Sequence, residues 1–285
     1  MKFLGRIGLL IALVFSLGST AGAAYHNVPY LPDMEEYEEI KAALQEMVPE
    51  VNEILKEEGY DKTITAEDIL LEEGYPIYLN ENYFSPEIDT PEDLLSLIEK
   101  QEHYVWKLPV KLNNQVLLLG LGKGYPVREQ AAASATAEQL AEIEKNVGKW
   151  HLTTVEFVQE AELYTQKVKD AGIDAEQVFF VNGPAGNYIQ MAICIDNGKF
   201  QDVLSLTNAE ISSQGNDVHA FADGAHYTYR ELQESLGMAA GKMGGGNGKI
   251  RVKDLTAGFG IVVIAALLFA FVSARRKYKE IHKNK

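Results

Sequence analysis

The chain has 285 residues, a single cysteine and a formal net charge of −15 at pH 7. Residues 25–250 contain 39 Asp or Glu against 16 Lys or Arg, and residues 25–102 alone contain 22 against four. This charge disfavours nucleic acid as a partner, because phosphate binding requires basic side chains. One cysteine excludes an intramolecular disulfide, so residues 25–250 are expected to fold around a hydrophobic core without covalent cross-links.

The first 24 residues have the layout of a secretory signal peptide. Lys2 and Arg6 precede an apolar run over residues 7–17, and small residues follow over 19–24. Cleavage is expected at the end of this small-residue stretch, after residue 23 or 24. An uncleaved signal anchor is the alternative, which the short apolar run disfavours.

The helical segments of the first half have recognisable starts and stops. Residues 33–58 predict helix interrupted at Pro49, because proline fits the first turn of a helix and not its interior. Two helices that meet near Val48 are therefore expected. Capping residues predict a short helix over 65–73 and a longer one over 90–101.

A β-hairpin is the clearest strand pattern in the chain. A brief strand is expected at 75–79, and large apolar residues then recur at every second position over 103–112. Two asparagines follow, which tolerate the positive φ of a tight turn, so residues 115–121 are expected to return as the partner strand. Pro109 lacks the N–H that a ladder needs, which predicts an edge strand or a bulge.

Two helices are expected after an Ala-rich passage at 131–137 that separates the halves of the chain. Thr136 with Gln139, and Thr153 with Glu156, have the spacing of capping boxes. The second helix would carry an amphipathic stripe and end at a glycine. The residues of this stripe are Phe157, Ala161, Tyr164, Val168 and Ala171, and the glycine is Gly172.

Three strands and a polar loop complete the expected domain. The strands span residues 177–181, 187–195 and 200–206, with Gly-rich and Asp-Asn-Gly turns between them. Residues 207–224 lack periodicity and are expected to form a loop, and a capping box predicts a short helix over 228–236.

These elements predict an α+β domain over residues 25–236, with roughly six short, mainly antiparallel strands and helices packed on one face. A helix followed by an antiparallel hairpin occurs twice, over 91–121 and 154–206. An internal duplication is therefore a hypothesis, although the residues of the two segments do not align well.

A membrane anchor is expected at the carboxyl end. A Gly-rich tether at 237–254 leads to the uncharged run 255–274, which is long enough to cross the hydrocarbon core of a bilayer as a helix. Residues 275–285 carry six Lys or Arg and one Glu, and such basic flanks stay on the cytoplasmic side. The expected location is the plasma membrane, single-pass, with the acidic domain outside and a bacterial source favoured.

One group of metal-ligand residue types occurs in the 217–226 loop. Asp217, His219, Asp223 and His226 offer carboxylate and imidazole ligands for a divalent ion, which would activate water for hydrolysis. Their spacing matches no pattern in which a helix or a rigid turn makes the ligands converge. A metal-dependent envelope hydrolase is therefore kept as an alternative function, and no residue is assigned to a metal, catalytic or cofactor site.

Aromatic residues near the first hairpin suggest a second kind of site. Next to Asn80, Asn82 and Asn114, they would line a sugar or peptide groove if they were exposed, although core packing explains them equally well. They are Tyr75, Tyr78, Tyr83, Phe84, Tyr104 and Trp106.

Other motifs point to structure rather than chemistry. Residues 120–124 are rich in glycine, but the lysine is not followed by Ser or Thr and no helix is expected directly behind it, as a phosphate loop requires. A glycine-rich strand end is therefore expected. Ser205 and Ser212 lack the glycines of a nucleophile elbow, and Cys194 alternates with isoleucines as a buried strand residue does.

The expected function is non-catalytic: a membrane-anchored module outside the cell that binds an envelope protein or polymer, or supports an assembly. The lipid bilayer is the expected partner of residues 255–274. A further alternative is a small regulatory subunit of a larger membrane complex. Alanines at 266, 270 and 274 would then give the span a small-residue packing face.

Overall fold

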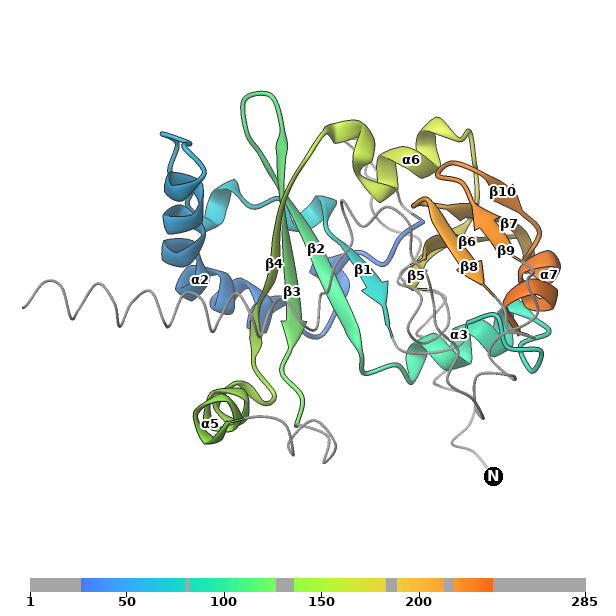
Figure 1. Ribbon diagram of the computed structural model, residues 1–285, viewed down its shortest axis with the longest axis horizontal. Helices are drawn as coiled ribbons and strands as arrows, with labels where there is room; N and C mark the ends of the chain where they lie inside the picture. The colour runs from blue at the N-terminus through green and yellow to red at the C-terminus, as the bar shows by residue number, and fades with distance from the viewer. Residues whose placement is uncertain (1–26, 80–82, 127–135, 183–188, 213–217, 238–285) are drawn as a thin grey trace, which may run out of the picture.

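The computed structural model describes residues 27–79, 83–126, 136–182, 189–212 and 218–237, shown in Figure 1. The helices in these residues are α2 (Tyr37–Glu57), α3 (Pro91–Glu99), α5 (Ala137–Asn146), α6 (Tyr164–Asp170) and α7 (Tyr229–Leu232). Short helical turns are η1 (Leu31–Asp33), η2 (Ala66–Asp68), η3 (Leu71–Glu73), η4 (Glu160–Glu162) and η5 (Gln233–Gly237).

The main sheet has eight strands in the order β10-β7-β6-β5-β1-β2-β3-β4. Its first half consists of β1 (Tyr75–Tyr78), β2 (Tyr104–Lys111), β3 (Val116–Lys123) and β4 (Trp150–Val158). Its second half consists of β5 (Gln177–Asn182), β6 (Gln190–Asp196), β7 (Lys199–Ser205) and β10 (His226–Tyr227). A separate hairpin pairs β8 (Ala209–Ser212) with β9 (Val218–Phe221).

Two antiparallel meanders meet at one parallel pair, β1 with β5, in the middle of the sheet. The predicted α+β class is confirmed, but the predicted number of strands is too low. The two meanders correspond topologically, because β1-β2-β3-β4 and β5-β6-β7-β10 each run outward from the centre in the same order. This correspondence pairs different segments from those that the sequence pattern suggested.

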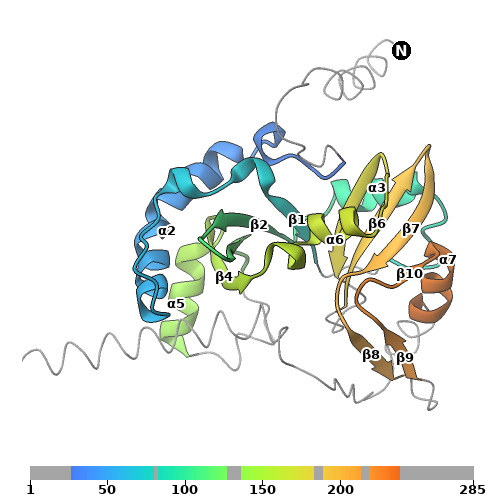
Figure 2. The same cartoon turned by 90° about the horizontal axis from the view of Figure 1, so that it is seen from above.

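Helices pack on both faces of the sheet, so the expectation of helices on one face is wrong. Helix α2 packs through Ile40, Leu44 and Val51 on the face that carries Trp106, which we call the α2 face. Helix α6 packs through Val168 on the opposite face, which carries Tyr75 and which we call the α6 face. Figure 2 shows the two helices on opposite sides of β2 and β4.

Helix α2 is continuous through Pro49, which corrects the prediction of two helices that meet near Val48. A proline inside a helix costs about 3 kcal/mol, because it removes one backbone hydrogen bond and crowds the preceding turn. The apolar stripe on both sides of Pro49 offsets this cost, since each fully buried Leu or Ile side chain contributes about 1.5–3 kcal/mol. The stripe consists of Ile40, Leu44, Met47, Val51 and Leu55.

Pro109 lies in β2, an interior strand of the sheet, and not in an edge strand. Its neighbour β1 is only four residues long and pairs with residues 104–107 of β2. At Pro109 the β2 strand therefore extends beyond the end of β1, where no ladder hydrogen bond requires an N–H. The carbonyl of Pro109 instead accepts a 2.9 Å bond from the backbone N–H of Leu70.

Three further segments differ from the sequence prediction. Residues 150–158 form β4 instead of starting a helix at Thr153, and the helix that follows is only α6. The predicted loop over 207–224 contains the β8–β9 hairpin. The short helix predicted over 65–73 is two separate turns, η2 and η3. The capping boxes at Thr65, Thr90 and Thr228 are confirmed.

The predicted signal peptide (1–24), most of the tether (237–254), the span (255–274) and the tail (275–285) lie outside the described residues. Within the described residues, none of the helices combines the length and apolar character that crossing a bilayer requires.

Candidate functional site

The two predicted metal-ligand residues whose side chains are described bond to different partners. Asp223 Oδ2 lies 2.6 Å from Lys167 Nζ, and His226 Nδ1 lies 2.5 Å from Asp202 Oδ2. Asp217 lies outside the described residues, and the His219 backbone lies in β9. No group of three or more His, Cys, Asp or Glu residues suited to a metal occurs in the described part of the chain.

The aromatic residues near the first hairpin form core and not an open groove. Tyr75, Tyr78, Tyr83, Phe84 and Trp106 are each at most 6 % exposed, and Tyr104 is partly buried. The hydroxyl of Tyr104 and the indole N–H of Trp106 both donate to the Glu36 carboxylate, at 2.9 and 3.2 Å. Tyr104 and Trp106 therefore join the start of α2 to the sheet. The burial of the other four rings agrees with the alternative interpretation as core packing.

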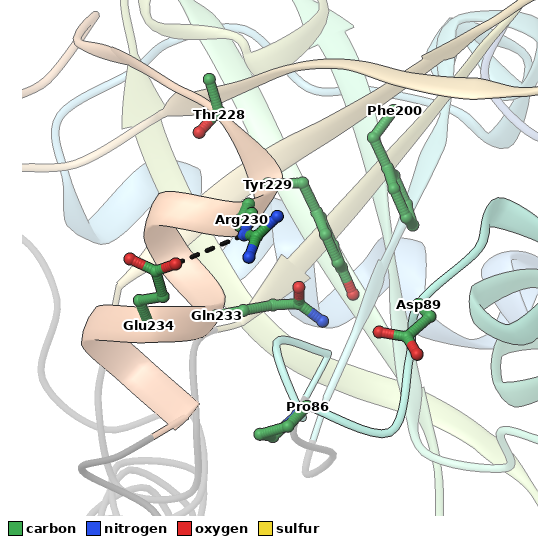
Figure 3. Close-up of a pocket in the computed structure, with 8 residues that line it drawn as sticks. All are labelled: Pro86, Asp89, Phe200, Thr228, Tyr229, Arg230, Gln233 and Glu234. Carbon is green, nitrogen blue, oxygen red and sulfur yellow. Dashed lines mark hydrogen bonds and ion pairs between the residues drawn. The ribbon is translucent and has the colours of Figure 1, made fainter.

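A hollow of about 640 Å³ lies beside α7 (Figure 3). Its floor is the Tyr229 ring, stacked on Phe200 with 3.7 Å between ring centroids. Arg230 and Glu234 on its rim pair with each other at 3.3 Å. Asp89 is the other charged residue of the lining, and the hollow opens to solvent, so its residues do not form a built site for a specific ligand.

Gln233 fastens α7 to the loop before α3. Its side-chain amide donates to the backbone carbonyls of Ser85 (3.0 Å) and Ile88 (2.7 Å). The Tyr229 hydroxyl donates to the carbonyl of Tyr83 in the same segment, and burial raises the pKa of this phenol. The α7–η5 segment, which precedes the predicted tether, is therefore held to the loop before α3 by three side-chain hydrogen bonds.

Replacing Gln233 with alanine is expected to lower the free energy of unfolding by about 1–3 kcal/mol, because two partly buried carbonyls lose their donor. Urea unfolding of the full chain in detergent micelles measures this change. The matched control is Gln201→Ala on β7, whose amide makes one long 3.4 Å bond at an exposed position. Equal destabilisation by the two variants would contradict the fastening role.

A charged side chain is buried in the first half of the sheet. Lys107 is 3 % exposed, and its Nζ lies 2.5 Å from Glu156 Oε1 and 2.9 Å from Thr154 Oγ1. Gly120 on the strand between them has no side chain, and a Cβ there would lie 2.2 Å from Thr154 Oγ1. The glycine thus makes room for an ion pair that neutralises Glu156 on β4.

Two candidate nucleophiles, Cys194 and Ser205, are buried within the second half of the sheet, and the side chain of the third, Ser212, lies outside the part of the chain that the structure describes. Burial raises the pKa of the Cys194 thiol to about 12, so the reactive thiolate is suppressed at neutral pH. Ser205 is 0 % exposed, and its hydroxyl donates to the carbonyl of Thr207. Gly120 and Gly122 lie in β3, in agreement with the prediction of a glycine-rich strand.

Strand β4 is the edge of the sheet, and its outer side pairs with no strand in the described residues. It is nine residues long, and every residue after the buried Trp150 is partly exposed. Glu156 is its only Asp, Glu, Lys or Arg, and Lys107 neutralises that carboxylate. The opposite edge, β10, has only two residues. Natural sheets often protect a long edge with charges, proline or a bulge; β4 has no proline and its one charge is neutralised, so the bulge at Thr153 is the only such device in the strand.

Helix α2 runs alongside β4 over its length. Near the start of α2, Glu39 Oε2 accepts a 3.2 Å hydrogen bond from the indole N–H of Trp150. Just beyond the other end of α2, the Tyr60 ring stacks on Phe157 with 4.9 Å between ring centroids. Helix and edge strand therefore run in the same direction, and together they form one candidate surface, the β4 edge (residues 150–158 with the adjoining side of α2).

The sequence analysis missed the β4 edge because it assigned residues 153–158 to a helix. The sequence does contain the alternation of a strand. Trp150 and Leu152, two residues apart, face α2, and so do Val155 and Phe157. Thr153 interrupts this alternation as an unpaired bulge residue, where the register with β3 shifts between Gly120 and Leu121.

Comparison with known proteins adds no relative: no protein-family model matches the chain, and neither a curated protein nor a solved structure is similar to it.

Proposed function

We propose that this protein is a single-pass, membrane-anchored binding module outside the cell, which holds an envelope protein by adding one of its strands to the β4 edge. The observation that carries this proposal is the nine-residue edge strand described above, whose outer side pairs with no strand in the described residues and which carries no unneutralised charge. The signal-peptide pattern, the Gly-rich tether and the apolar run 255–274 support the anchored location.

Strand addition fits the chemistry of this edge. An added strand hydrogen-bonds to main-chain N–H and C=O groups, which supplies affinity, while neighbouring side chains supply specificity. The half-buried side chains of Leu152, Val155 and Phe157 would lose their remaining contact with water when a strand covers them. The partner gains the same backbone pairing, so an extended segment is favoured over a helix.

A binding role is also consistent with the burial of two possible nucleophiles and with the existing contacts of the predicted metal ligands. Cys194 and Ser205 are buried in the core, Asp223 forms an ion pair with Lys167, and His226 contacts Asp202. The β4 edge requires no reactive group, since backbone pairing alone supplies its interaction.

Photocross-linking in intact cells tests the proposal. A photoreactive amino acid at His151 in β4 is expected to form a covalent adduct with an envelope protein. The matched control places the same amino acid at Lys199, an exposed residue of β7. Adducts of equal yield at both positions, or no adduct at His151, would overturn the proposal.

The anchored location has its own test. Alkaline carbonate is expected to leave the protein in the membrane pellet, and protease added to cells with a permeable outer layer is expected to digest the acidic domain. Release by carbonate, or complete protection from protease, would show that the membrane part of the proposal is wrong.

A further inference from the structure

We infer that the strand bound at the β4 edge is basic, with Lys or Arg at every second position facing α2. This inference rests on the proposed function, since it specifies the partner of the same surface. Its basis is the acidic side of α2 that faces the β4 edge.

The side of α2 that faces β4 is identified by Glu39. Its carboxylate contacts Trp150 at the start of β4 and Lys123 at the end of β3, both at 3.2 Å. Glu46 and Glu50 follow seven and 11 residues later, so at about 3.6 residues per turn they lie on the same side of the helix.

The opposite side of α2 faces a different part of the molecule. Asn52 accepts a 2.7 Å bond from the backbone N–H of Ile64 and donates a 2.9 Å bond to its carbonyl. The groove between that side of α2 and the η2–η3 turns includes Lys41 and Gln45. Glu46 and Glu50 are therefore directed away from the η2–η3 turns and toward the β4 side.

Glu46 and Glu50 are exposed, and neither forms an ion pair with another described residue. A strand added to β4 would lie about 4.8 Å from it, and its side chains would point alternately to the two faces of the sheet. Every second side chain would then lie beside this acidic side of α2, where Lys or Arg gains favourable electrostatic energy.

On the α6 face of the sheet, no acidic side favours basic residues in the partner strand. Glu156 is the one acidic residue of β4 on that face, and Lys107 already neutralises it. Uncharged residues such as Thr or Val are therefore expected at the alternate positions of the partner. A second copy of this chain is disfavoured as the occupant, because it would bring the same acidic α2 toward the first.

Peptide binding to the full chain in detergent micelles tests the inference by fluorescence anisotropy. Two synthetic peptides share an alternating Val and Thr pattern, and one carries Lys where the other carries Glu at every second position. The Lys peptide is expected to bind at least about ten-fold more tightly, and added salt is expected to weaken its binding. Equal binding of the peptides, or binding that salt does not change, would overturn the basic partner and leave strand addition intact.

The double variant Glu46→Lys with Glu50→Lys is expected to raise the Kd of the Lys peptide about ten-fold, because two attractive contacts become repulsive. The control Glu87→Lys with Glu99→Lys makes the same change in net charge at exposed positions outside α2 and β4. Equal weakening by both variants would show that only net charge matters and would overturn the role of α2.

The remaining outcomes separate the two proposals. If neither peptide binds but His151 still cross-links to an envelope protein, strand capture stands and the basic partner is wrong. If the chain instead sediments as a dimer that salt strengthens and cross-links to itself at His151, the occupant is a second copy, and the basic partner is likewise overturned.

Discussion

Replacing Glu156 with glutamine is expected to lower the free energy of unfolding by about 2–4 kcal/mol. The Lys107 ammonium is 3 % exposed, and the Glu156 carboxylate is its only charged partner among the described residues. The glutamine keeps the size of the side chain but leaves a buried positive charge without compensation. The loss is below the upper end for buried pairs because the Glu156 side chain is 42 % exposed.

A second substitution, at Lys107, tests whether the loss of stability comes from the unpaired buried charge. The double variant Lys107→Met with Glu156→Gln removes both charges and is expected to recover most of the lost stability. Urea unfolding measures the free energy of unfolding of both variants. The control is Glu160→Gln, an exposed position on the nearby η4 turn. A double variant less stable than Glu156→Gln alone would mean that Lys107 contributes stability beyond balancing this charge.

The local rules of the sequence predicted much of the first half of the fold. The hairpin of β2 and β3 followed from alternation and an Asn-Asn turn, and the helix after Thr90 followed from its threonine cap and the proline at its first position. These signals depend on residues close together in the chain, so they can be interpreted without tertiary information.

Pairing between distant segments could not be predicted in the same way. The central contact joins β1 to β5 in parallel, across about 100 residues of chain, and no local pattern specifies that register. The placement of α2 and α6 on opposite faces also depends on contacts between distant segments, so it was missed as well. Pro49 shows the same limit, because burial of the stripe around it overrides the local preference of proline.

The β4 edge was not predicted because the sequence of residues 153–158 is compatible with both a helix and a strand. Thr153 and Glu156 have capping-box spacing, but in the structure Glu156 pairs with Lys107 across the sheet and Thr153 is a bulge residue. Lys107 alternates with the large apolar residues of β2, and nothing in its local sequence indicated that it is buried. Only the three-dimensional neighbours distinguish a cap from a cross-strand ion pair.

Replacing Trp106 with alanine is expected to lower the free energy of unfolding by about 3–5 kcal/mol. The indole is 0 % exposed and packs with Leu108 and Leu119 beneath α2, so the substitution leaves a large cavity. Its N–H also donates to Glu36, which would lose one of the two donors that Tyr104 and Trp106 provide.

Two further variants separate packing from the hydrogen bond. Trp106→Phe retains an aromatic ring but no donor, so it is expected to recover more than half of the loss if packing dominates. Tyr104→Phe removes the other donor to Glu36 and is expected to lower the free energy of unfolding by only about 0.5–1.5 kcal/mol.

Trp106→Ala is also expected to reduce cross-linking from His151 under conditions where the chain stays folded. The reason is that α2 lies along β4 and would lose its packing contact with Trp106. A Trp106→Ala variant with wild-type unfolding and undiminished cross-linking would show that this core does not support the β4 edge.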